Sequence, residues 1–225
     1  AYKGRKIGAI GHATAFSFYA NKNMTTGEGG MITTNDPELA DRCRILSLHG
    51  ISRDAWKRYT AAGSWYYEVT ELGYKYNMPD VLAAIGLCQL HKLDALNARR
   101  QAIAEQYHRA FGEMDFLEPF PPAVPAYSTH VWHLYTILLR LDTLRIGRDQ
   151  FIDELKARGI GVSVHYIPIH FHPHYQGYGW RRGDFPHTEA YYARTISLPL
   201  YPSLTDADVS RVIETVYEVG AQWQR

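Results

Sequence analysis

The feature that most constrains the fold is a long amphipathic pattern in the middle of the chain. Between positions 90 and 111 the apolar residues recur at intervals of three, four or seven residues, which is the spacing of one face of an α-helix. They are Leu90, Leu93, Leu96, Ile103, Tyr107 and Phe111. We expect a helix of this length to bridge two domains, and we place the boundary at its start, with residues 1–90 in the first domain and 91–225 in the second.

The second half predicts a small α/β domain, because strand and helix patterns alternate after the long helix. The predicted elements are, in chain order, a proline-rich linker at 119–125, a strand at 130–140, a helix at 147–158, a strand at 160–166, and an amphipathic helix after the capping box at 205–208. Ahead of the long helix, a second helix pattern begins after the capping residue Asp36. The helical pattern of the long helix begins earlier, after Pro79, with an apolar face that includes Val81, Ile85 and Cys88, and it persists from Leu90.

Composition excludes several classes of partner. The formal charge of +1 gives no electrostatic basis for binding nucleic acid or an anionic membrane. We find no apolar run near the roughly 20 residues that a membrane-spanning helix needs. The two cysteines, Cys43 and Cys88, are too few for a disulfide framework, and we expect them to be buried in a reducing compartment. A cytoplasmic location is therefore expected.

The first half contains one arrangement that suggests chemistry. Phe16 and Phe18 belong to a predicted short buried strand, and the chain then turns at 21–23 and passes through the glycine-rich segment 27–30. Lys22 thus follows a strand, five residues after Ser17. Lysine amines form Schiff bases with carbonyl cofactors, and a nearby hydroxyl can bind a cofactor phosphate. The alternative is an ordinary solvated lysine at a turn.

Several separated motifs, all in one order, resemble the DegT/StrS-type sugar aminotransferases. The motifs are residues 17–30, 49–50, 72–80, 83–86, 89–90, 164–170 and 197–202. The resemblance implies an α/β protein of fold-type I of the pyridoxal phosphate (PLP)-dependent transferases, of which this chain would hold the C-terminal part of the large domain plus the small domain. It also implies an N-terminal portion, with most of the parallel sheet and the residues that contact the pyridine ring, that cannot be assigned here.

The resemblance assigns roles to four residues of the first half. Lys22 would hold PLP covalently and act as the catalytic base, and Ser17 would bind the phosphate. The segment 72–80 would reach the active site of a neighbouring subunit, so a homodimer with shared sites is implied. There Lys75 and Asn77 stand where the family more often has asparagine and arginine, and either could donate to the phosphate. The alternative for both is a turn and helix cap.

Histidines gather in the second half. They are His165, His170, His172 and His174. The resemblance implies that His165, Tyr166 and His170 lie on a loop bordering the substrate cleft, and packing of that loop is the alternative. A zinc site is a further alternative, but Pro168 and Pro173 break any helix that could align the rings, so we predict no metal.

The resemblance implies PLP-dependent transamination of a nucleotide-linked 4-keto sugar, with L-glutamate as the amino donor. The pathway would be amino-sugar and cell-surface polysaccharide biosynthesis, such as that of lipopolysaccharide. The Lys75 and Asn77 variant most resembles the family's enzymes that make UDP-4-amino-4-deoxy-L-arabinose. Two alternatives remain open: a non-catalytic PLP-binding regulator or scaffold, and a histidine-ligated metalloprotein. The long segment 51–70, rich in aromatic residues, is expected to contact either substrate or a partner subunit.

Overall fold

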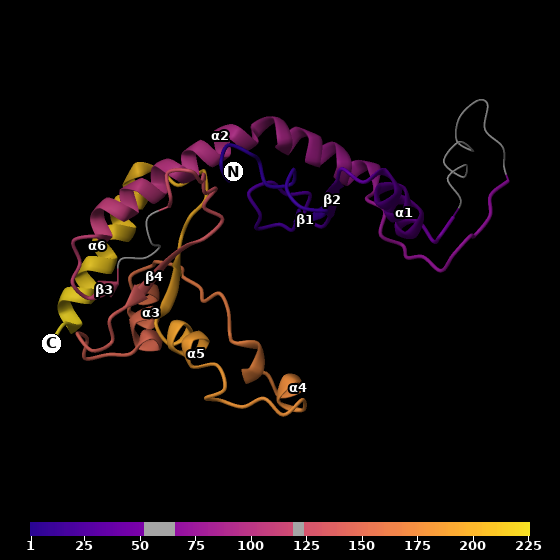
Figure 1. The fold of residues 1–225 in the computed structure, drawn as a ribbon. Helices are drawn as coiled ribbons and strands as arrows, with labels where there is room; N and C mark the ends of the chain where they lie inside the picture. The colour runs from indigo at the N-terminus through magenta and orange to yellow at the C-terminus, as the bar shows by residue number, and fades with distance from the viewer. Residues whose placement is uncertain (52–65, 119–123) are drawn as a thin grey trace. The chain divides into compact units, whose positions relative to one another are not determined.

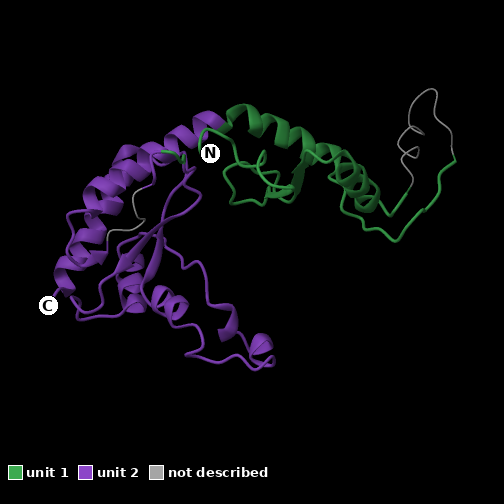
Figure 2. Cartoon of the chain, in the orientation of Figure 1, with its two compact units in different colours: residues 1–93, 127–129 green, residues 94–126, 130–225 purple. Residues whose placement is uncertain are grey.

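The structure, a computed structural model, describes residues 1–51, 66–118 and 124–225. It divides into two compact units (Figure 2). Unit 1 comprises residues 1–93 with 127–129, and unit 2 comprises residues 94–126 with 130–225. The 32-residue helix α2 (Asp80–Phe111) contributes to both units, so the helical pattern predicted after Pro79 and onward from Leu90 is confirmed as one continuous helix. Most of the predicted linker 119–125 and of the aromatic segment 51–70 lies outside the described residues.

Unit 1 contains a two-stranded sheet and a helix. Strands β1 (Ala13–Ser17) and β2 (Gly30–Thr34) pair antiparallel, with Ser17 opposite Gly30. Helix α1 (Pro37–Ser47) follows, and the Asp36 carboxylate accepts the N–H groups at the second and third helical positions at 2.9 and 3.1 Å. The predicted helix cap is therefore confirmed.

The prediction of a buried strand around Phe16 and Phe18 is wrong. Strand β1 ends at Ser17, and four of its five residues are exposed, Phe16 by 36%. The physical reason is that β1 pairs only with β2 among the described residues, and two strands cannot bury each other's faces.

The first turns of α2 also differ from the prediction. Val81 is 73% exposed and Ile85 44% exposed, and Cys88, one turn further on, is exposed rather than buried. The helical spacing was read correctly, but none of the described segments covers this face. An apolar pattern indicates which face of a helix avoids water, and it does not identify the surface that covers that face.

Unit 2 is a three-stranded antiparallel sheet packed with helices (Figure 1). The sheet has the order β3 (Leu117–Glu118), β4 (Tyr135–Leu139), β5 (Thr195–Leu198). The helices, besides the second half of α2, are α3 (Arg148–Ala157), α4 (Pro173–Gln176), α5 (Pro186–Tyr192) and α6 (Asp206–Trp223), with a 3-10 turn at Ile169–Phe171. The core is formed chiefly by α2, β4, α3, β5 and α6.

Helix α6 follows the sequence prediction closely. The pattern predicted that one face would contain Val209, Val212, Ile213, Val216 and Val219; the four valines are buried and Ile213 is partly buried. The Thr205 hydroxyl accepts the Asp208 N–H at 3.1 Å and the Asp208 carboxylate accepts the Thr205 N–H at 2.9 Å, which confirms the capping box.

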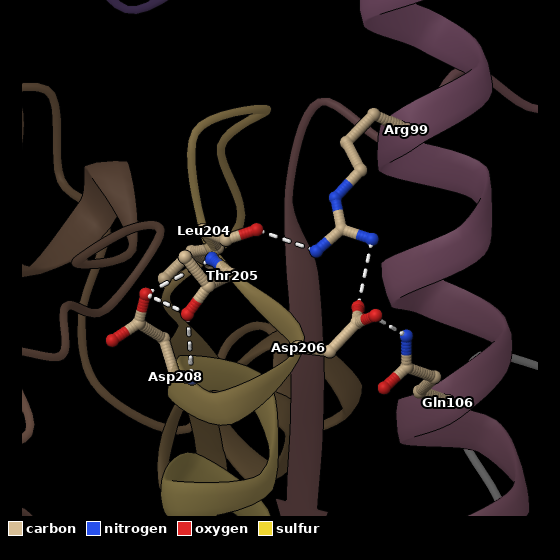
Figure 3. A network of polar contacts seen from close by, with 6 residues as sticks. All are labelled: Arg99, Gln106, Leu204, Thr205, Asp206 and Asp208. Atoms are coloured by element: carbon tan, nitrogen blue, oxygen red, sulfur yellow. Dashed lines mark hydrogen bonds and ion pairs between the residues drawn. The ribbon is translucent and has the colours of Figure 1, made fainter.

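An adjacent polar network joins the start of α6 to α2 (Figure 3). The Arg99 guanidinium contacts the Asp206 carboxylate at 2.8 Å and the Leu204 carbonyl at 2.5 Å. The Gln106 amide donates to the same carboxylate at 3.1 Å. The two helices are thus joined by directional bonds as well as by apolar packing.

Two predicted strands need correction. The strand expected over 130–140 is confined to Tyr135–Leu139, because Trp132 has a positive φ of 44° and its N–H bonds the His130 ring instead of a neighbouring strand. The strand expected over 160–166 does not form. Only Ser163 pairs there, with Ser197, as an isolated bridge. Alternating hydrophobicity therefore predicted the central part of the first strand, Tyr135–Leu139, but it did not predict how many residues would find a backbone partner.

None of the helices in the described parts of the chain combines the length and apolarity needed to cross a membrane.

Candidate functional site

Lys22 lies on a tightly bonded loop that connects β1 to β2. The Phe18 N–H donates to the Gly29 carbonyl at 2.8 Å, and the Thr26 N–H donates to the Phe18 carbonyl at 2.9 Å. Within this frame the Lys22 N–H closes a turn onto the Tyr19 carbonyl at 3.0 Å. Because its backbone is held at three points, the loop presents the Lys22 side chain from a defined position.

The Lys22 side chain is half-buried, and in the described part of the chain its ammonium group has no hydrogen-bond or ion-pair partner. An amine that is not held in an ion pair is available for covalent chemistry with a carbonyl. Ser17 ends β1, and its Oγ lies 3.4 Å from the Tyr19 N–H, which leaves the hydroxyl proton free to donate.

The Lys22 loop rests on the segment that leads into α2. A Cβ added to Gly29 would lie 2.7 Å from the Met78 Cε atom and 2.6 Å from the Thr26 hydroxyl, and Gly29 has a positive φ of 148°, which favours glycine. A Cβ added to Gly86 in α2 would lie 3.0 Å from the Thr26 methyl group. The glycines therefore allow the loop to pack closely against Met78 and α2.

The segment containing Lys75 and Asn77 is attached to the C-terminal end of α1. The Tyr74 N–H donates to the Leu46 carbonyl at 2.7 Å, and the N–H groups of Tyr76 and Asn77 donate to the Ser47 carbonyl at 2.8 and 3.0 Å. The last carbonyls of a helix have no partner within the helix, so this strand-like segment satisfies them. The helix end in turn fixes where the two polar side chains emerge.

A pair of glycines makes this attachment possible. A Cβ on Gly73 would lie 2.1 Å from the Gly50 nitrogen, and a Cβ on Gly50 would lie 1.7 Å from the Glu71 carbonyl oxygen. Gly50 also has a positive φ of 69°, which favours glycine for a second reason. The two backbones therefore touch where any side chain would separate them.

Lys75 and Asn77 form one donor pair. The Lys75 ammonium donates to the Asn77 side-chain oxygen at 2.5 Å, so the amide nitrogen of Asn77 and the remaining ammonium protons stay available to a second acceptor. The sequence left open which of the two contacts a phosphate. The geometry indicates that they would act together, since each orients the other.

The cofactor implied by the resemblance requires an amine for its aldehyde and several donors for its phosphate. Unit 1 provides an amine at Lys22 that has no partner among the described residues, a hydroxyl at Ser17, and the donor pair of Lys75 and Asn77, which the resemblance assigns to a neighbouring subunit's site. The donor chemistry of these residues therefore fits PLP.

His165 and Tyr166 lie in unit 2, at the entrance to an extended loop. The His165 Nδ1 atom lies 2.7 Å from the Ser197 hydroxyl on β5, and the Ser163 and Ser197 backbones exchange hydrogen bonds at 2.8 and 3.2 Å. Tyr166 next to it is 67% exposed. Ser197 was not predicted as a site residue, although it begins one of the resembling motifs.

His170 is buried at the other end of that loop. It is 4% exposed, and its Nε2 atom lies 2.9 Å from Glu189 Oε1 on α5. The same oxygen accepts the Gly183 N–H at 2.6 Å. The bonds from Gly183 and His170 hold the pKa of Glu189 below its usual value. Since the resulting carboxylate only accepts, the His170 Nε2 atom carries the proton. No sequence pattern indicated Glu189.

Among the residues that the structure describes, the histidines of this loop do not assemble a metal site. In the ranges that the structure describes, no three His, Cys, Asp or Glu side chains are placed to share a metal ion. His165 and His170 instead have the separate partners Ser197 and Glu189.

An open pocket of about 600 Å3 lies in unit 2, between the start of α3 and α5. Two guanidinium groups lie over aromatic rings at its wall: Arg182 at 3.7 Å from the centre of Phe171, and Arg148 at 4.8 Å from the centre of Tyr192. The carboxylates of Asp149 and Glu189 also line it. Because these charges balance, the pocket has no electrostatic preference for an anion.

Comparison with known proteins decides the family. The sequence profile of the DegT/DnrJ/EryC1/StrS aminotransferase family matches residues 1–217. The chain belongs to this family. The family that the motifs resembled is thereby confirmed.

Among individual proteins, the chain is 52% identical over 220 residues to the spore coat polysaccharide biosynthesis protein SpsC of Bacillus subtilis, covering 97% of this chain and 56% of SpsC. It superposes with a TM-score of 0.84 on the PLP form of a candidate sugar aminotransferase, Spr1654 of Streptococcus pneumoniae, at 33% identity over 98% of this chain and 55% of that one. The aminotransferase PseC of Helicobacter pylori gives a TM-score of 0.87 at 28% identity, over 99% of this chain and 57% of PseC.

The solved relatives confirm the predicted fold class, an α/β protein of fold-type I of the PLP-dependent transferases. The chain spans somewhat more than half the length of the curated relatives it matches.

Proposed function

We propose that this chain provides the lysine and the phosphate-binding donors of a PLP-dependent sugar aminotransferase. Residues 1–90 would be the C-terminal part of its PLP-binding large domain, and residues 91–225 the bridging helix and small domain. The substrate would be a nucleotide-linked 4-keto sugar and the amino donor L-glutamate. The cytoplasmic location inferred from composition stays a prediction.

The observation that carries this proposal is the combination at Lys22 of a fixed backbone and an amine that no described residue binds. Its side chain leaves a loop whose backbone is bonded at three points, and its amine has no polar partner among the described residues. A surface lysine whose only role was to interact with water would not require a backbone held by hydrogen bonds or the close glycine contacts of this loop. Family membership supplies the cofactor for which such an amine is suited.

PLP, when bound, supplies an electron sink that stabilises a carbanion at the α-carbon of an amino donor. The Lys22 amine would hold the cofactor covalently and, once displaced by the donor, would remove the proton from the donor's α-carbon as a general base. The Ser17 hydroxyl and the Lys75–Asn77 pair would neutralise the phosphate by charge-assisted hydrogen bonds.

Relatives support the substrate class and the pathway. SpsC is named for spore coat polysaccharide biosynthesis, and PseC is described as an aminotransferase in the biosynthesis of pseudoaminic acid. We therefore place this chain in amino-sugar biosynthesis for a cell-surface polysaccharide. Its assembly would be a homodimer in which the 72–80 segment of one subunit completes the phosphate site of the other.

Borohydride reduction of the full-length protein followed by peptide mass mapping tests the proposal. Reduction should fix a pyridoxyl group on the peptide containing Lys22. Lys22→Ala should lose the adduct and all turnover, because the residue that moves the proton is gone. Lys92→Ala, which removes an exposed lysine of α2, should keep both.

Adduct formation at another lysine, or full turnover by Lys22→Ala, would refute the role of Lys22. A PLP-binding scaffold would give the adduct but no change in cofactor absorbance with L-glutamate. Absorbance change therefore separates the enzyme from the non-catalytic alternative.

A further inference from the structure

The open pocket of unit 2 is lined by two opposite charges that do not pair with each other. It has a volume of about 600 Å3 and lies between the start of α3 and α5. Arg182 and Glu189 both line it, yet no ion pair joins these two side chains. A guanidinium and a carboxylate that face one cavity without pairing are complementary to a ligand that carries both charges.

The Arg182 guanidinium is held in orientation by an aromatic ring. Its central carbon lies 3.7 Å from the centre of the Phe171 ring. Stacking of this kind uses the flat face of a guanidinium and leaves its N–H groups at the edge, in the fork that matches a carboxylate. Among the described residues no acceptor is bonded to these N–H groups. Arg182 therefore presents a carboxylate-binding edge from a defined position.

Glu189 has one carboxylate oxygen to offer a ligand. Its Oε1 atom accepts the Gly183 N–H at 2.6 Å and the His170 Nε2 proton at 2.9 Å, whereas its Oε2 atom has no hydrogen-bond partner in the described part of the chain. The bonds from Gly183 and His170 hold the pKa of Glu189 below its usual value, so the carboxylate is charged at neutral pH. A charged oxygen with no donor of its own suits an ammonium group.

The other two charges of the pocket satisfy each other. The Arg148 side chain, only 8% exposed, bonds the Asp149 carboxylate at 2.5 Å and the Tyr192 carbonyl at 3.2 Å. The charges that remain for a ligand are therefore one cation and one anion. An anionic ligand would leave Glu189 unpaired, and a cationic ligand would leave Arg182 unpaired.

We propose that this pocket binds the zwitterionic backbone of an α-amino acid, with its carboxylate on Arg182 and its ammonium group on Glu189. The site goes beyond the proposed function, because the pocket is lined by unit 2 alone. An α-amino acid carries its two charges on one carbon, so few bonds must be ordered for it to meet both partners. The volume is within the range of small-molecule pockets and accommodates a side chain as well.

The test uses the full-length, PLP-loaded protein after borohydride reduction, which fixes the cofactor so that no amino acid is transaminated. L-Alanine is the probe, and propionate and ethylamine each carry one of its two charges. Affinities are measured by titration calorimetry. Arg182→Gln removes the cation at an exposed position, and Arg181→Gln alters the adjacent exposed arginine, which does not line the pocket, as the matched control.

We expect propionate and ethylamine to bind at least roughly tenfold more weakly than L-alanine, because each leaves one charge of the pocket unpaired. Arg182→Gln should weaken the binding of L-alanine by a similar factor and leave that of ethylamine unchanged, since ethylamine has no carboxylate for Arg182 to bind. Arg181→Gln should match wild type with all three probes.

L-Alanine that binds wild type no more tightly than propionate or ethylamine, or not at all, would overturn the proposal. Equal affinity of wild type and Arg182→Gln for L-alanine would overturn it too, as would equal losses in Arg181→Gln and Arg182→Gln. Absence of the pyridoxyl adduct from Lys22 would instead refute the proposed function, and the same titrations would still test the pocket.

Discussion

Gly73→Ala should detach the Lys75–Asn77 segment from α1. The added methyl carbon would lie 2.1 Å from the Gly50 nitrogen and 2.6 Å from the His49 carbonyl carbon, and both are backbone atoms that cannot rotate away. Overpacking of this kind costs about 1–3 kcal/mol. The segment also makes three hydrogen bonds to the Leu46 and Ser47 carbonyls, each worth about 1 kcal/mol. If part of these bonds is lost as well, the free energy of unfolding should decrease by about 2–4 kcal/mol in total.

Urea unfolding of the full-length protein measures this cost, and the PLP content after dialysis measures the displacement of Lys75 and Asn77. Gly161→Ala is the control, because Gly161 has open space around its Cβ position and no positive φ. We expect the control to be neutral or slightly stabilising. A Gly73→Ala protein within about 0.5 kcal/mol of wild type, with full PLP retention, would show that the segment can move without cost and would refute the reasoning.

Three further predictions concern unit 2. Thr205→Ala should lower the free energy of unfolding by about 1 kcal/mol through loss of the capping box, as urea denaturation would measure. Arg100→Met should cost about 2–4 kcal/mol, because the buried guanidinium donates to two buried carbonyls at 2.9 and 3.1 Å that would lose their partner. Hydrogen bonds from Gln106 and Arg99 lower the pKa of Asp206 in the folded protein. The ionised carboxylate therefore contributes its full stabilisation above the unfolded pKa of about 3.9, and this stabilisation is lost as the pH falls through the lower pKa of the folded state. Asp206→Asn should flatten the acid limb of a stability-against-pH curve, whereas Asp153→Asn, at an exposed partnerless position within the described chain, should leave it unchanged.

The sequence by itself determined the features that depend on neighbouring residues. The caps at Asp36 and Thr205, the long helix α2 and the buried face of α6 were all predicted, because each depends on residues within a few positions of one another. The family was also readable, since its motifs are short and ordered along the chain.

Only the tertiary structure decided which surfaces meet. Alternating residues at 160–166 could not reveal that a single position would find a strand partner, and the pattern around Phe16 could not reveal that its strand would stay exposed. The contact of Gly50 with Gly73 and the bond of Glu189 to His170 join positions 23 and 19 residues apart. Such pairings depend on how distant segments pack, and a one-dimensional pattern fixes the character of a face without fixing what lies against it.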